Sequence, residues 1–375
     1  MTKNRSRVKG DRVRMGVIGV GIMGQDHCAG FAKVPEIQLT AVCDGFAENA
    51  RKVGEKFQVP FFTNHRDLIR SGLCDAVLIS TPHPIRPPMA IDVMKAGLHL
   101  LSEKPLAECV SAADRMIRAA RDNKVAFGVM FQRRTEPAFI KAYEWIRSGA
   151  LGTVWRTTLI APEYRTQAYY NSGKWRATWV GEGGGVMINQ APHMLDMFIR
   201  LGGMPCEVLG RCETRLHKIE VEDMADALLR YPEGGTGYFY TSTNETGPGQ
   251  MIELFGTRGK LCYRDGLLTL HRFSEPVPDF TFRTSIPFSA PESIRDGAEI
   301  RNTDGGHHLV AQNFARHLLH GESLLSPGEE GLRSLELANA VWLSAHTGKA
   351  VKLPLKRRAY DAFLAAKRKA FPGPV

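Results

Sequence analysis

A glycine-rich turn between an apolar run and a helical segment constrains this chain more than any other stretch. Residues 14–18 are predicted to form a short β-strand. The turn that follows has the sequence Gly19-Val20-Gly21-Ile22-Met23-Gly24. A helix is expected over about 25–33, and a second strand over 38–43 ends at Asp44. This order of strand, turn, helix and strand is typical of a dinucleotide-binding unit.

Each glycine of the turn has a physical role in such a unit. Gly19 permits the tight turn, Gly21 lets the backbone approach a pyrophosphate, and Gly24 lets helix and strand pack closely. The helix N-terminus adds free N–H groups, so Ile22 and Met23 are assigned to the cofactor site with the glycines. A glycine-rich turn that serves only packing is the alternative.

Asp44 predicts which dinucleotide is bound. It lies 20 residues beyond Gly24, where a carboxylate can accept hydrogen bonds from both ribose hydroxyls. The same carboxylate repels a 2′-phosphate, and neither Gly45 nor Phe46 could bind one. NAD is therefore the predicted cofactor, in preference to NADP.

The length of 375 residues predicts two domains, with residues 1–131 in the first and 132–375 in the second. Strands and helices alternate up to about residue 131, which predicts an α/β Rossmann domain with a doubly wound parallel sheet. Strand-like runs between 206 and 273 follow one another without helices, which predicts an α+β domain with a mainly antiparallel sheet. The C-terminal helix is expected to pack back on the Rossmann domain.

Charge and cysteine content exclude several classes of protein. The net charge of +10 comes mostly from scattered basic residues, so a solvated surface is expected and nucleic-acid binding is not. Seven cysteines without a C-x-x-C pair or zinc-like spacing indicate reduced thiols in the cytoplasm and predict no metal site. No run reaches the roughly 18 apolar residues of a spanning helix, so no membrane partner is expected.

Two later turns of the first domain are expected to reach the cofactor. One follows the predicted strand at 75–80 and the other the strand at 98–101. Ligands of doubly wound sheets bind at the carboxyl ends of strands. The predicted cofactor contacts from these turns and from the end of the domain are Ser80, Thr81, Pro82, His83, Glu103, Lys104 and Gln132.

Lys104 is the first candidate catalytic residue. It lies between Glu103 and Pro105, which would hold it rigidly, and a cationic nicotinamide nearby would make its proton easier to lose. It could then hold, and deprotonate, a hydroxyl that is being oxidised. The alternative is a surface lysine paired with Glu103.

His193 is the second candidate. Asn189, His193 and Asp196 fall on one face of the helix expected over about 186–201. The preceding Gly183-Gly184-Gly185 would let a flat ligand press against the backbone. A histidine suits proton transfer coupled to hydride transfer, whereas a hydrogen-bonded core histidine is the alternative.

The loop 162–180 is aromatic and basic. Its aromatic residues are Tyr164, Tyr169, Tyr170, Trp175 and Trp179. They could stack on a sugar ring while Arg165 and Arg176 bind hydroxyls or cofactor, or they could simply pack. We assign Tyr164, Arg165 and Tyr170 to the substrate site. Trp175 and Arg176 are assigned to the cofactor site.

Taken together, these residues resemble the Gfo/Idh/MocA family, which contains glucose-fructose oxidoreductase and inositol 2-dehydrogenase. The resemblance rests on the glycine turn with Asp44, Ser80-Thr81-Pro82, Glu103-Lys104-Pro105, Trp175-Arg176, and the triple glycine through His193 and Asp196. It implies that Lys104 and His193 are catalytic. It also implies a large open sheet in the second domain, often used for oligomer contacts, and hence a homodimer or homotetramer.

Two positions depart from the family pattern. Asn189 stands where the family commonly has Asp, and an amide cannot accept a proton. Proton handling would then rest on His193 and Lys104, with Asn189 kept as a catalytic position. Arg86 stands where many members have His.

The resulting prediction is NAD-dependent oxidation of a secondary hydroxyl on a sugar, glycoside or cyclic polyol to a ketone. The expected substrate contacts are Lys104, Tyr164, Arg165, Tyr170, Asn189 and His193. One alternative is a redox-neutral NAD-dependent glycosidase of the same family. Another is a regulatory protein that senses dinucleotide or sugar without chemistry.

Overall fold

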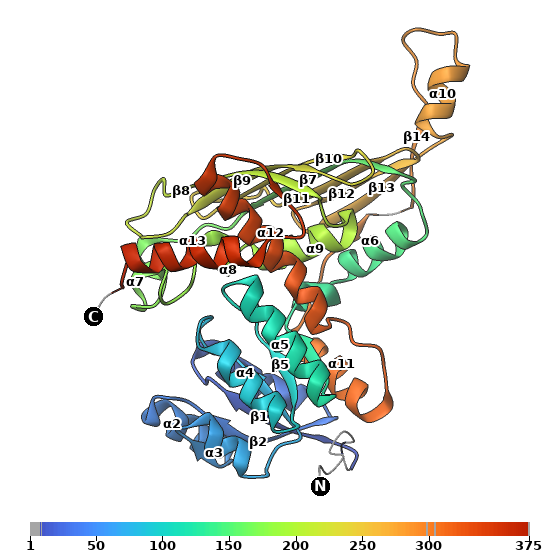
Figure 1. The fold of residues 1–375 in the computed structure, drawn as a ribbon. Helices are drawn as coiled ribbons and strands as arrows, with labels where there is room; N and C mark the ends of the chain where they lie inside the picture. The colour runs from blue at the N-terminus through green and yellow to red at the C-terminus, as the bar shows by residue number, and fades with distance from the viewer. Residues whose placement is uncertain (1–7, 9, 298, 304, 374–375) are drawn as a thin grey trace. The chain divides into compact units, whose positions relative to one another are not determined.

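The computed structural model describes residues 8, 10–297, 299–303 and 305–373, and the chain divides into two compact units (Figure 1). The first unit runs to Gln132 and also contains Val180–Gly183 and Gly306–Leu335. The second contains Arg133–Trp179, Gly184–Gly305 and the chain from Glu336 onward. The division after Gln132 lies one residue from the expected boundary, but two later segments return to the first unit. The C-terminal helix belongs to the second unit.

The first unit is built on a six-stranded parallel sheet with the order β3-β2-β1-β4-β5-β6. Its strands are β1 (Val13–Ile18), β2 (Ile37–Cys43), β3 (Phe61–Phe62), β4 (Ala76–Ile79), β5 (His99–Ser102) and β6 (Phe127–Val129). This order is the doubly wound one, so the predicted fold class is confirmed. All four residues of β4 are buried, as expected for a strand covered on both faces.

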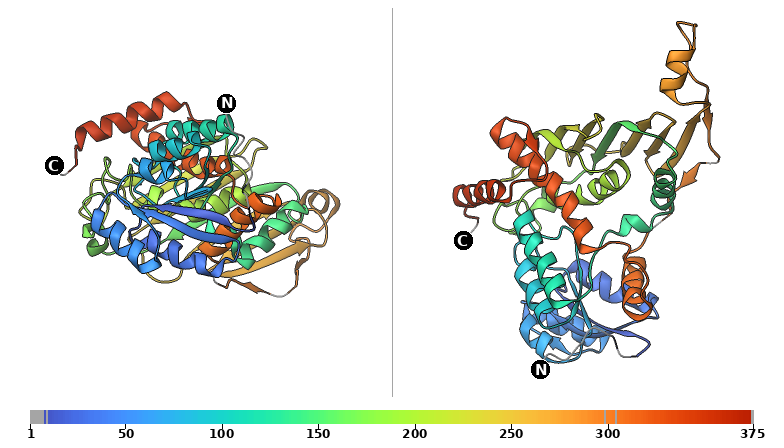
Figure 2. Two further views of the ribbon diagram at one scale, coloured as in Figure 1. Left: turned by 90° about the horizontal axis from the view of Figure 1, so that it is seen from below. Right: turned by 45° about the vertical axis from the view of Figure 1, so that its right-hand side comes forward.

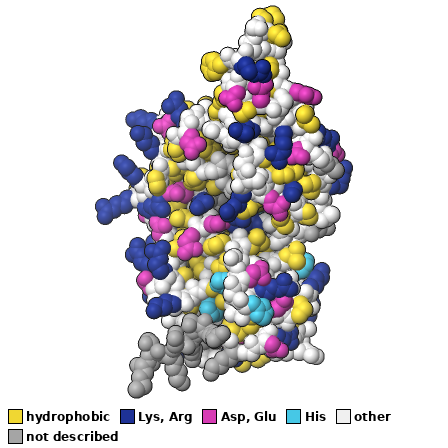
Figure 3. All heavy atoms as spheres, turned by 90° about the vertical axis from the view of Figure 1, so that its right-hand side faces the viewer, with side chains coloured by type: hydrophobic (Ala, Val, Ile, Leu, Met, Phe, Trp, Pro, Cys, Tyr) yellow, Lys and Arg dark blue, Asp and Glu magenta, His cyan; other side chains and the backbone are white. Residues whose placement is uncertain are grey.

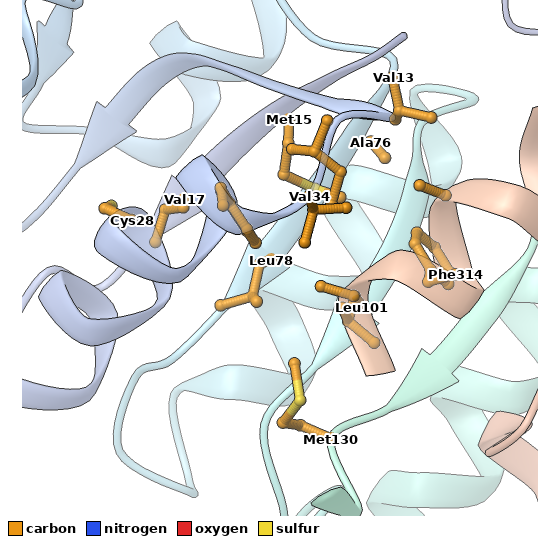
Figure 4. Close-up of a cluster of buried hydrophobic side chains, with 14 of the residues drawn as sticks. Val13, Met15, Val17, Cys28, Val34, Ala76, Leu78, Leu101, Met130 and Phe314 are labelled. Atoms are coloured by element: carbon orange, nitrogen blue, oxygen red, sulfur yellow. The ribbon is translucent and has the colours of Figure 1, made fainter. Parts of the chain in front are cut away.

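Helices surround this sheet and complete its core. They are α1 (Ile22–Gly30), η1 (Phe31–Lys33), α2 (Ala47–Phe57), α3 (His65–Arg70), α4 (Arg86–Lys95), α5 (Val110–Asn123) and α11 (His307–His320). Figure 4 shows Val17 of β1, Leu78 of β4 and Leu101 of β5 in one buried apolar cluster with Phe314 of α11. Residues near position 314 therefore complete a core that begins at position 13.

The second unit contains a ten-stranded sheet with the order β14-β13-β12-β11-β7-β10-β9-β8-β16, and β15 pairs with β13. Its strands are β7 (Val154–Pro162), β8 (Glu207–Glu213), β9 (Met224–Arg230), β10 (Thr236–Ser242), β11 (Met251–Gly256), β12 (Gly259–Arg264), β13 (Leu267–Phe273), β14 (Ser293–Arg295), β15 (Ile300–Arg301) and β16 (Val351–Lys352). The pairs are antiparallel except β7 with β10, which confirms a mainly antiparallel sheet. Burial alternates along β11, so one face of the sheet is covered and the other is more open.

The helices of the second unit vary widely in length. They are η2 (Gln132–Thr135), which begins at the unit boundary, α6 (Pro137–Arg147), α7 (Gln167–Asn171), α8 (Val186–Asn189), α9 (Pro192–Gly202), α10 (Val277–Arg283) and α13 (Arg357–Ala370). Helix α12 (Gly328–Thr347) begins in the first unit and ends in the second. The right-hand view of Figure 2 shows α10 projecting from the sheet edge formed by β13 and β14.

Charged side chains of both signs are mixed on the face shown in Figure 3. This agrees with a scattered distribution of basic residues rather than a single basic surface. Within the described part of the chain, no helix combines the length and the apolar character that a bilayer crossing requires.

The single helix expected over 186–201 is wrong, because two helices occupy this stretch. Asn189 ends α8, and Pro192 is the first residue of α9. A proline fits at that position because the first N–H of a helix has no intrahelical acceptor. Asn189 and His193 therefore do not share one continuous helical face.

The triple glycine before α8 packs against the protein itself. A Cβ on Gly184 would lie 2.1 Å from the Trp342 ring, and one on Gly185 would lie 1.8 Å from the carbonyl oxygen of Glu222. The Glu222 carboxylate also accepts hydrogen bonds from the N–H groups of Gly185 and Met187, at 3.0 and 3.1 Å. Gly184 and Gly185 therefore allow close internal packing, whereas the sequence suggested room for a flat ligand.

Replacing Glu222 with Gln is expected to remove a pH dependence of stability. Burial raises the pKa of the Glu222 carboxyl to about 7, although the N–H groups of Met187 and Gly185 oppose this rise. The unfolded chain releases this proton near pH ~4.3, so the stabilisation is complete below that pH and is lost as pH rises through 7, by about 3 kcal/mol.

Calorimetric unfolding from acidic to mildly alkaline pH would check this prediction. The wild-type protein should lose stability across the range relative to E222Q. The exposed Glu233 offers a control, since E233Q should follow the wild type. Parallel curves for wild type and E222Q would contradict the prediction.

Candidate active site

The glycine-rich turn of the first unit has the geometry expected for binding a dinucleotide. A Cβ on Gly24 would lie 2.0 Å from the carbonyl oxygen of Gly19, so α1 begins in direct contact with the end of β1. A Cβ on Gly21 would meet no atom within 4 Å, so the backbone there is open. Ile22 and Met23 are 80% and 40% exposed. The turn is thus closed on the protein side and open where a pyrophosphate would approach.

Asp44 lies at the end of β2 and is held by backbone groups. Its Oδ2 accepts the N–H of Val20 at 2.9 Å, and its Oδ1 accepts the N–H of Phe46 at 2.9 Å. Each carboxylate oxygen has a second lone pair for a further donor. The side chain is therefore oriented by the glycine turn and can still accept bonds from ribose hydroxyls.

The turn after β4 contains Ser80, Thr81, Pro82 and His83. Thr81 Oγ1 is buried and has no hydrogen-bond partner within the described residues, so it suits a polar ligand group. Ser80 and Pro82 are partly buried. His83 is buried and its Nδ1 lies 2.9 Å from the carbonyl oxygen of Glu182. This ring nitrogen thus holds the segment 180–183, and the assignment of His83 to the cofactor stays a prediction.

Arg86 links the turns that follow β4 and β5. Its buried guanidinium donates to the carbonyl oxygens of Thr81 at 2.5 Å, Glu103 at 2.8 Å, and Pro105. Burial lowers the pKa of Arg86 to about 10, so it remains charged at neutral pH. The residue that departs from the family pattern therefore fixes the backbone on both sides of Lys104.

Glu103 is buried, and both of its carboxylate oxygens have partners in the first unit. Its Oε1 lies 2.7 Å from Nε2 of His27, and its Oε2 accepts the backbone N–H of Lys104 at 3.0 Å. Burial acts to raise the pKa of Glu103, but the hydrogen bond and charge of His27 outweigh it and hold the pKa at about 2. Through Oε2, Glu103 holds the backbone of Lys104, and its assignment to the cofactor stays a prediction.

In the second unit, three N–H donors converge on the hydroxyl oxygen of Tyr169. They are Nδ2 of Asn189 and Nε2 of Gln190, each at 3.0 Å, and a guanidinium N–H of Arg176 at 2.9 Å. The Arg176 guanidinium also lies 4.5 Å from the centre of the Tyr169 ring. Asn189 is therefore fixed as a hydrogen-bond donor in this cluster.

His193 lies in the first turn of α9 and is partly buried. Two buried hydrogen bonds, at 2.6 and 2.8 Å, join the Asp196 carboxylate to the Arg134 guanidinium. This bidentate pair fastens α9 to the 3₁₀ helix η2. Asp196 thus anchors the helix that carries His193.

The remaining predicted residues of the loop 162–180 have mixed surroundings. Tyr164 is 45% exposed, and Arg165 pairs with Glu163. Tyr170 is 5% exposed and its hydroxyl lies 2.8 Å from that of Thr243, and its assignment to the substrate stays a prediction.

Trp175 and Gln132 are two further residues predicted to contact the cofactor. Trp175 stacks with Arg176, whose guanidinium lies 4.5 Å from the ring centre. Gln132 begins η2 and is partly buried at the last position of the first unit. The assignment of Trp175, Arg176 and Gln132 to the cofactor site stays a prediction.

Sequence reasoning missed three residues that organise these groups: His27, Tyr169 as the partner of Asn189, and Glu222. His27 follows Gly24 by three residues, so it lies nearly one turn further along the same helix. Its spacing from Gly24 is a local signal, because it places His27 on the same buried face of α1 as Gly24. Glu222 left no local signal, because its partners Gly185 and Met187 are distant in sequence.

Comparisons with known proteins agree with this geometry. Residues 13–131 match the family model described as "Oxidoreductase family, NAD-binding Rossmann fold", and residues 139–262 match the GFO/IDH/MocA C-terminal domain. The chain is 25% identical to the myo-inositol 2-dehydrogenase of Thermotoga maritima over 91% of this chain and 98% of that protein. It is 25% identical to the levoglucosan dehydrogenase of Pseudarthrobacter phenanthrenivorans over 67% of this chain and 73% of that protein.

A solved structure is similar over nearly the whole chain. The WlbA dehydrogenase of Bordetella pertussis, solved in complex with NADH and UDP-GlcNAcA, has a TM-score of 0.79 and 27% identity. The similarity covers 92% of this chain and 100% of that one. The expected cofactor class, NAD, agrees with the matched family description of the first unit. The chain therefore belongs to the GFO/IDH/MocA oxidoreductase family, with an NAD-binding Rossmann domain and the family's C-terminal domain.

Proposed function

We propose that this protein is an NAD-dependent dehydrogenase that oxidises a secondary hydroxyl of a sugar, glycoside or cyclic polyol to a ketone. The observation that carries the proposal is the fixed position of Lys104. Glu103 and Arg86 hold the backbone around it at the carboxyl end of β5, in the same unit as an open dinucleotide turn. A lysine on a fixed backbone at the cofactor edge of this sheet suits hydroxyl binding.

The first unit would bind NAD through its own backbone and three side chains. The N–H groups at the start of α1 would hold the pyrophosphate, and Asp44 would accept bonds from the ribose. The buried Thr81 hydroxyl and the Lys104 amine supply polar contacts further along the edge. When bound, NAD supplies the acceptor for the hydride that leaves the carbinol carbon.

Proton handling is proposed to fall on Lys104 and His193. The Lys104 ammonium would donate a hydrogen bond to the hydroxyl oxygen, which favours the developing alkoxide. The His193 imidazole would accept the hydroxyl proton. Histidine suits this role because its ordinary pKa lies near neutral pH, so the imidazole can both accept and release a proton.

The relatives and the donor groups of the second unit support the proposed substrate class. Relatives named for inositol and levoglucosan dehydrogenation act on polyhydroxylated rings. Asn189 and Arg165 offer the hydrogen bonds that hydroxyls need, and Tyr164 offers a ring face. We further propose a homodimer or homotetramer that uses the open sheet, and a cytoplasmic location, which the seven free cysteines support.

A substrate panel tests the proposed function directly. Purified protein is mixed with NAD and, separately, free sugars, inositols and aryl glucosides at mildly alkaline pH, and the NADH absorbance band is followed. We expect a rise with one substrate class. Phenol release from a glycoside without NADH would indicate a redox-neutral glycosidase, and NAD binding without any turnover across the panel would count against the dehydrogenase.

Replacing Lys104 with Ala should reduce kcat by at least about 100-fold, because the group that stabilises the developing alkoxide is lost. NAD affinity, measured by titration of protein fluorescence, should fall by no more than about tenfold, the value of one charge-assisted hydrogen bond, since the glycine turn and Asp44 are unchanged. The exposed Lys95 at the end of α4 is the matched control, and K95A should behave as the wild type. Near-normal turnover of K104A would overturn the assignment.

Replacing Asp44 with Ala should weaken NAD binding by about tenfold, the typical value of a hydrogen bond to a charged group. NADP should be affected less, because the carboxylate that repels its 2′-phosphate is also removed. Dissociation constants for both dinucleotides, from calorimetric titration, measure the change in their ratio. The control is E48A, which removes an exposed acid of α2 paired with Lys52. An unchanged ratio in D44A would refute the role of Asp44 in cofactor choice.

A further inference from the structure

A buried pair joins the helix of the glycine turn to the strand end that carries Lys104. Nε2 of His27, in α1, lies 2.7 Å from Oε1 of Glu103, which follows β5. The two residues are 2% and 5% exposed. A carboxylate can only accept a hydrogen bond, so the Nε2 that faces it carries the proton. The pair therefore connects two elements of the first unit through one charge-assisted contact.

The same carboxylate sets the backbone of Lys104. Its second oxygen, Oε2, accepts the Lys104 N–H at 3.0 Å. The Glu103 backbone is itself held on both sides, because its N–H donates to Ile79 at 2.9 Å and its carbonyl accepts from Arg86 at 2.8 Å. With the Glu103 backbone held in this way, its side chain adds a direct bond to the N–H of Lys104 and places a carboxylate beside the residue.

Several charged and titratable groups lie near the His27–Glu103 pair, on the elements that pack against it. The charge of Lys104 acts on the Glu103 carboxylate, and Arg86 of α4 donates to the Glu103 carbonyl oxygen. His307, at the start of α11, meets the His27 ring edge-on with 5.2 Å between ring centres. Burial lowers the pKa of His307, while Glu103 and Asp26 act to raise it. The carboxylate of Glu103 is the negative charge closest to the Lys104 backbone in this group.

We propose that His27 is a positioning residue for Lys104. It fixes the Glu103 carboxylate, and Glu103 in turn sets the orientation and electrostatic surroundings of the Lys104 amine. The consequence for turnover rests on the proposed function, in which Lys104 acts on the substrate hydroxyl. The effect on the reactivity of the Lys104 amine does not depend on the proposed function, because that reactivity can be measured without turnover.

The arrangement also ties Lys104 to the cofactor helix. His27 lies one turn beyond Gly24, whose close contact with Gly19 fixes the start of α1. The helix end proposed to hold the pyrophosphate and the amine proposed to hold the hydroxyl are therefore connected by a single side-chain pair. A pair with a purely structural role would lower stability without changing the reactivity of Lys104.

Three variants separate these roles. H27L removes the donor to Glu103, whereas H27Q keeps an amide N–H at about the position of Nε2. H65L is the matched control, since His65 lies 3.0 Å from Asp92 in the same unit and Asp92 keeps Arg66 as a partner. If H27L does not fold, H27N replaces it, because its shorter amide cannot reach Glu103.

The first readout is the rate at which acetic anhydride labels the Lys104 amine in dinucleotide-free protein over a pH series, followed by mass spectrometry. We expect the rate to change about threefold or more in H27L, because the neighbouring carboxylate loses its fixed position, and to stay near wild type in H27Q and H65L. The second readout is kcat and KM on the substrate found in the panel, with kcat lowered about tenfold in H27L at similar KM.

The outcomes distinguish this inference from the proposed function. Unchanged labelling in a folded H27L or H27N would overturn the positioning role, whatever happens to turnover. A labelling change that H27Q does not reverse would overturn it too, since the N–H donor would then not be what matters. Full turnover of K104A would refute the proposed function while the labelling comparison still decides the role of His27.

Discussion

The close contact between Gly24 and the carbonyl oxygen of Gly19 governs the arrangement of the first unit. Any side chain at Gly24 would place its Cβ 2.0 Å from that oxygen, so α1 can begin where it does only with glycine there. Two consequences follow from the position of α1. The backbone at Gly21 faces open space, and His27, one turn later, comes within 2.7 Å of Glu103. One steric constraint therefore determines both the phosphate-binding geometry and the surroundings of the lysine motif.

Two glycine-rich segments that look alike in the sequence have different physical roles. Gly21 is open, as the dinucleotide fingerprint predicts, whereas Gly184 and Gly185 are closed by Trp342 and Glu222. The first role could be predicted because its partners, a strand and a helix, are adjacent in the chain. The second could not, because the ring and the carbonyl that require glycine come from distant parts of the sequence.

The same distinction explains how much of the fold could be predicted. Alternating strands and helices indicated the parallel sheet, because strand and helix periodicity is a local pattern. The return of Gly306–Leu335 to the first unit was not found, since Phe314 completes the core only in three dimensions. The face shared by Asn189 and His193 failed at Pro192, which begins a new helix. In the proposed site, local motifs predicted Asp44 and Lys104, but not the partners that orient Lys104.

The amide at Asn189 is matched to its neighbours in the second unit. Its Nδ2, a guanidinium N–H of Arg176 and Nε2 of Gln190 all point to the Tyr169 oxygen. A carboxylate at 189 would replace one of these donors with an acceptor and would compete with Tyr169 for Arg176. The departure from the usual Asp is therefore one part of a consistent donor cluster around a phenol. Within the proposed mechanism, this cluster can orient a hydroxylated ligand but cannot take up its proton through Asn189, which leaves that step to His193.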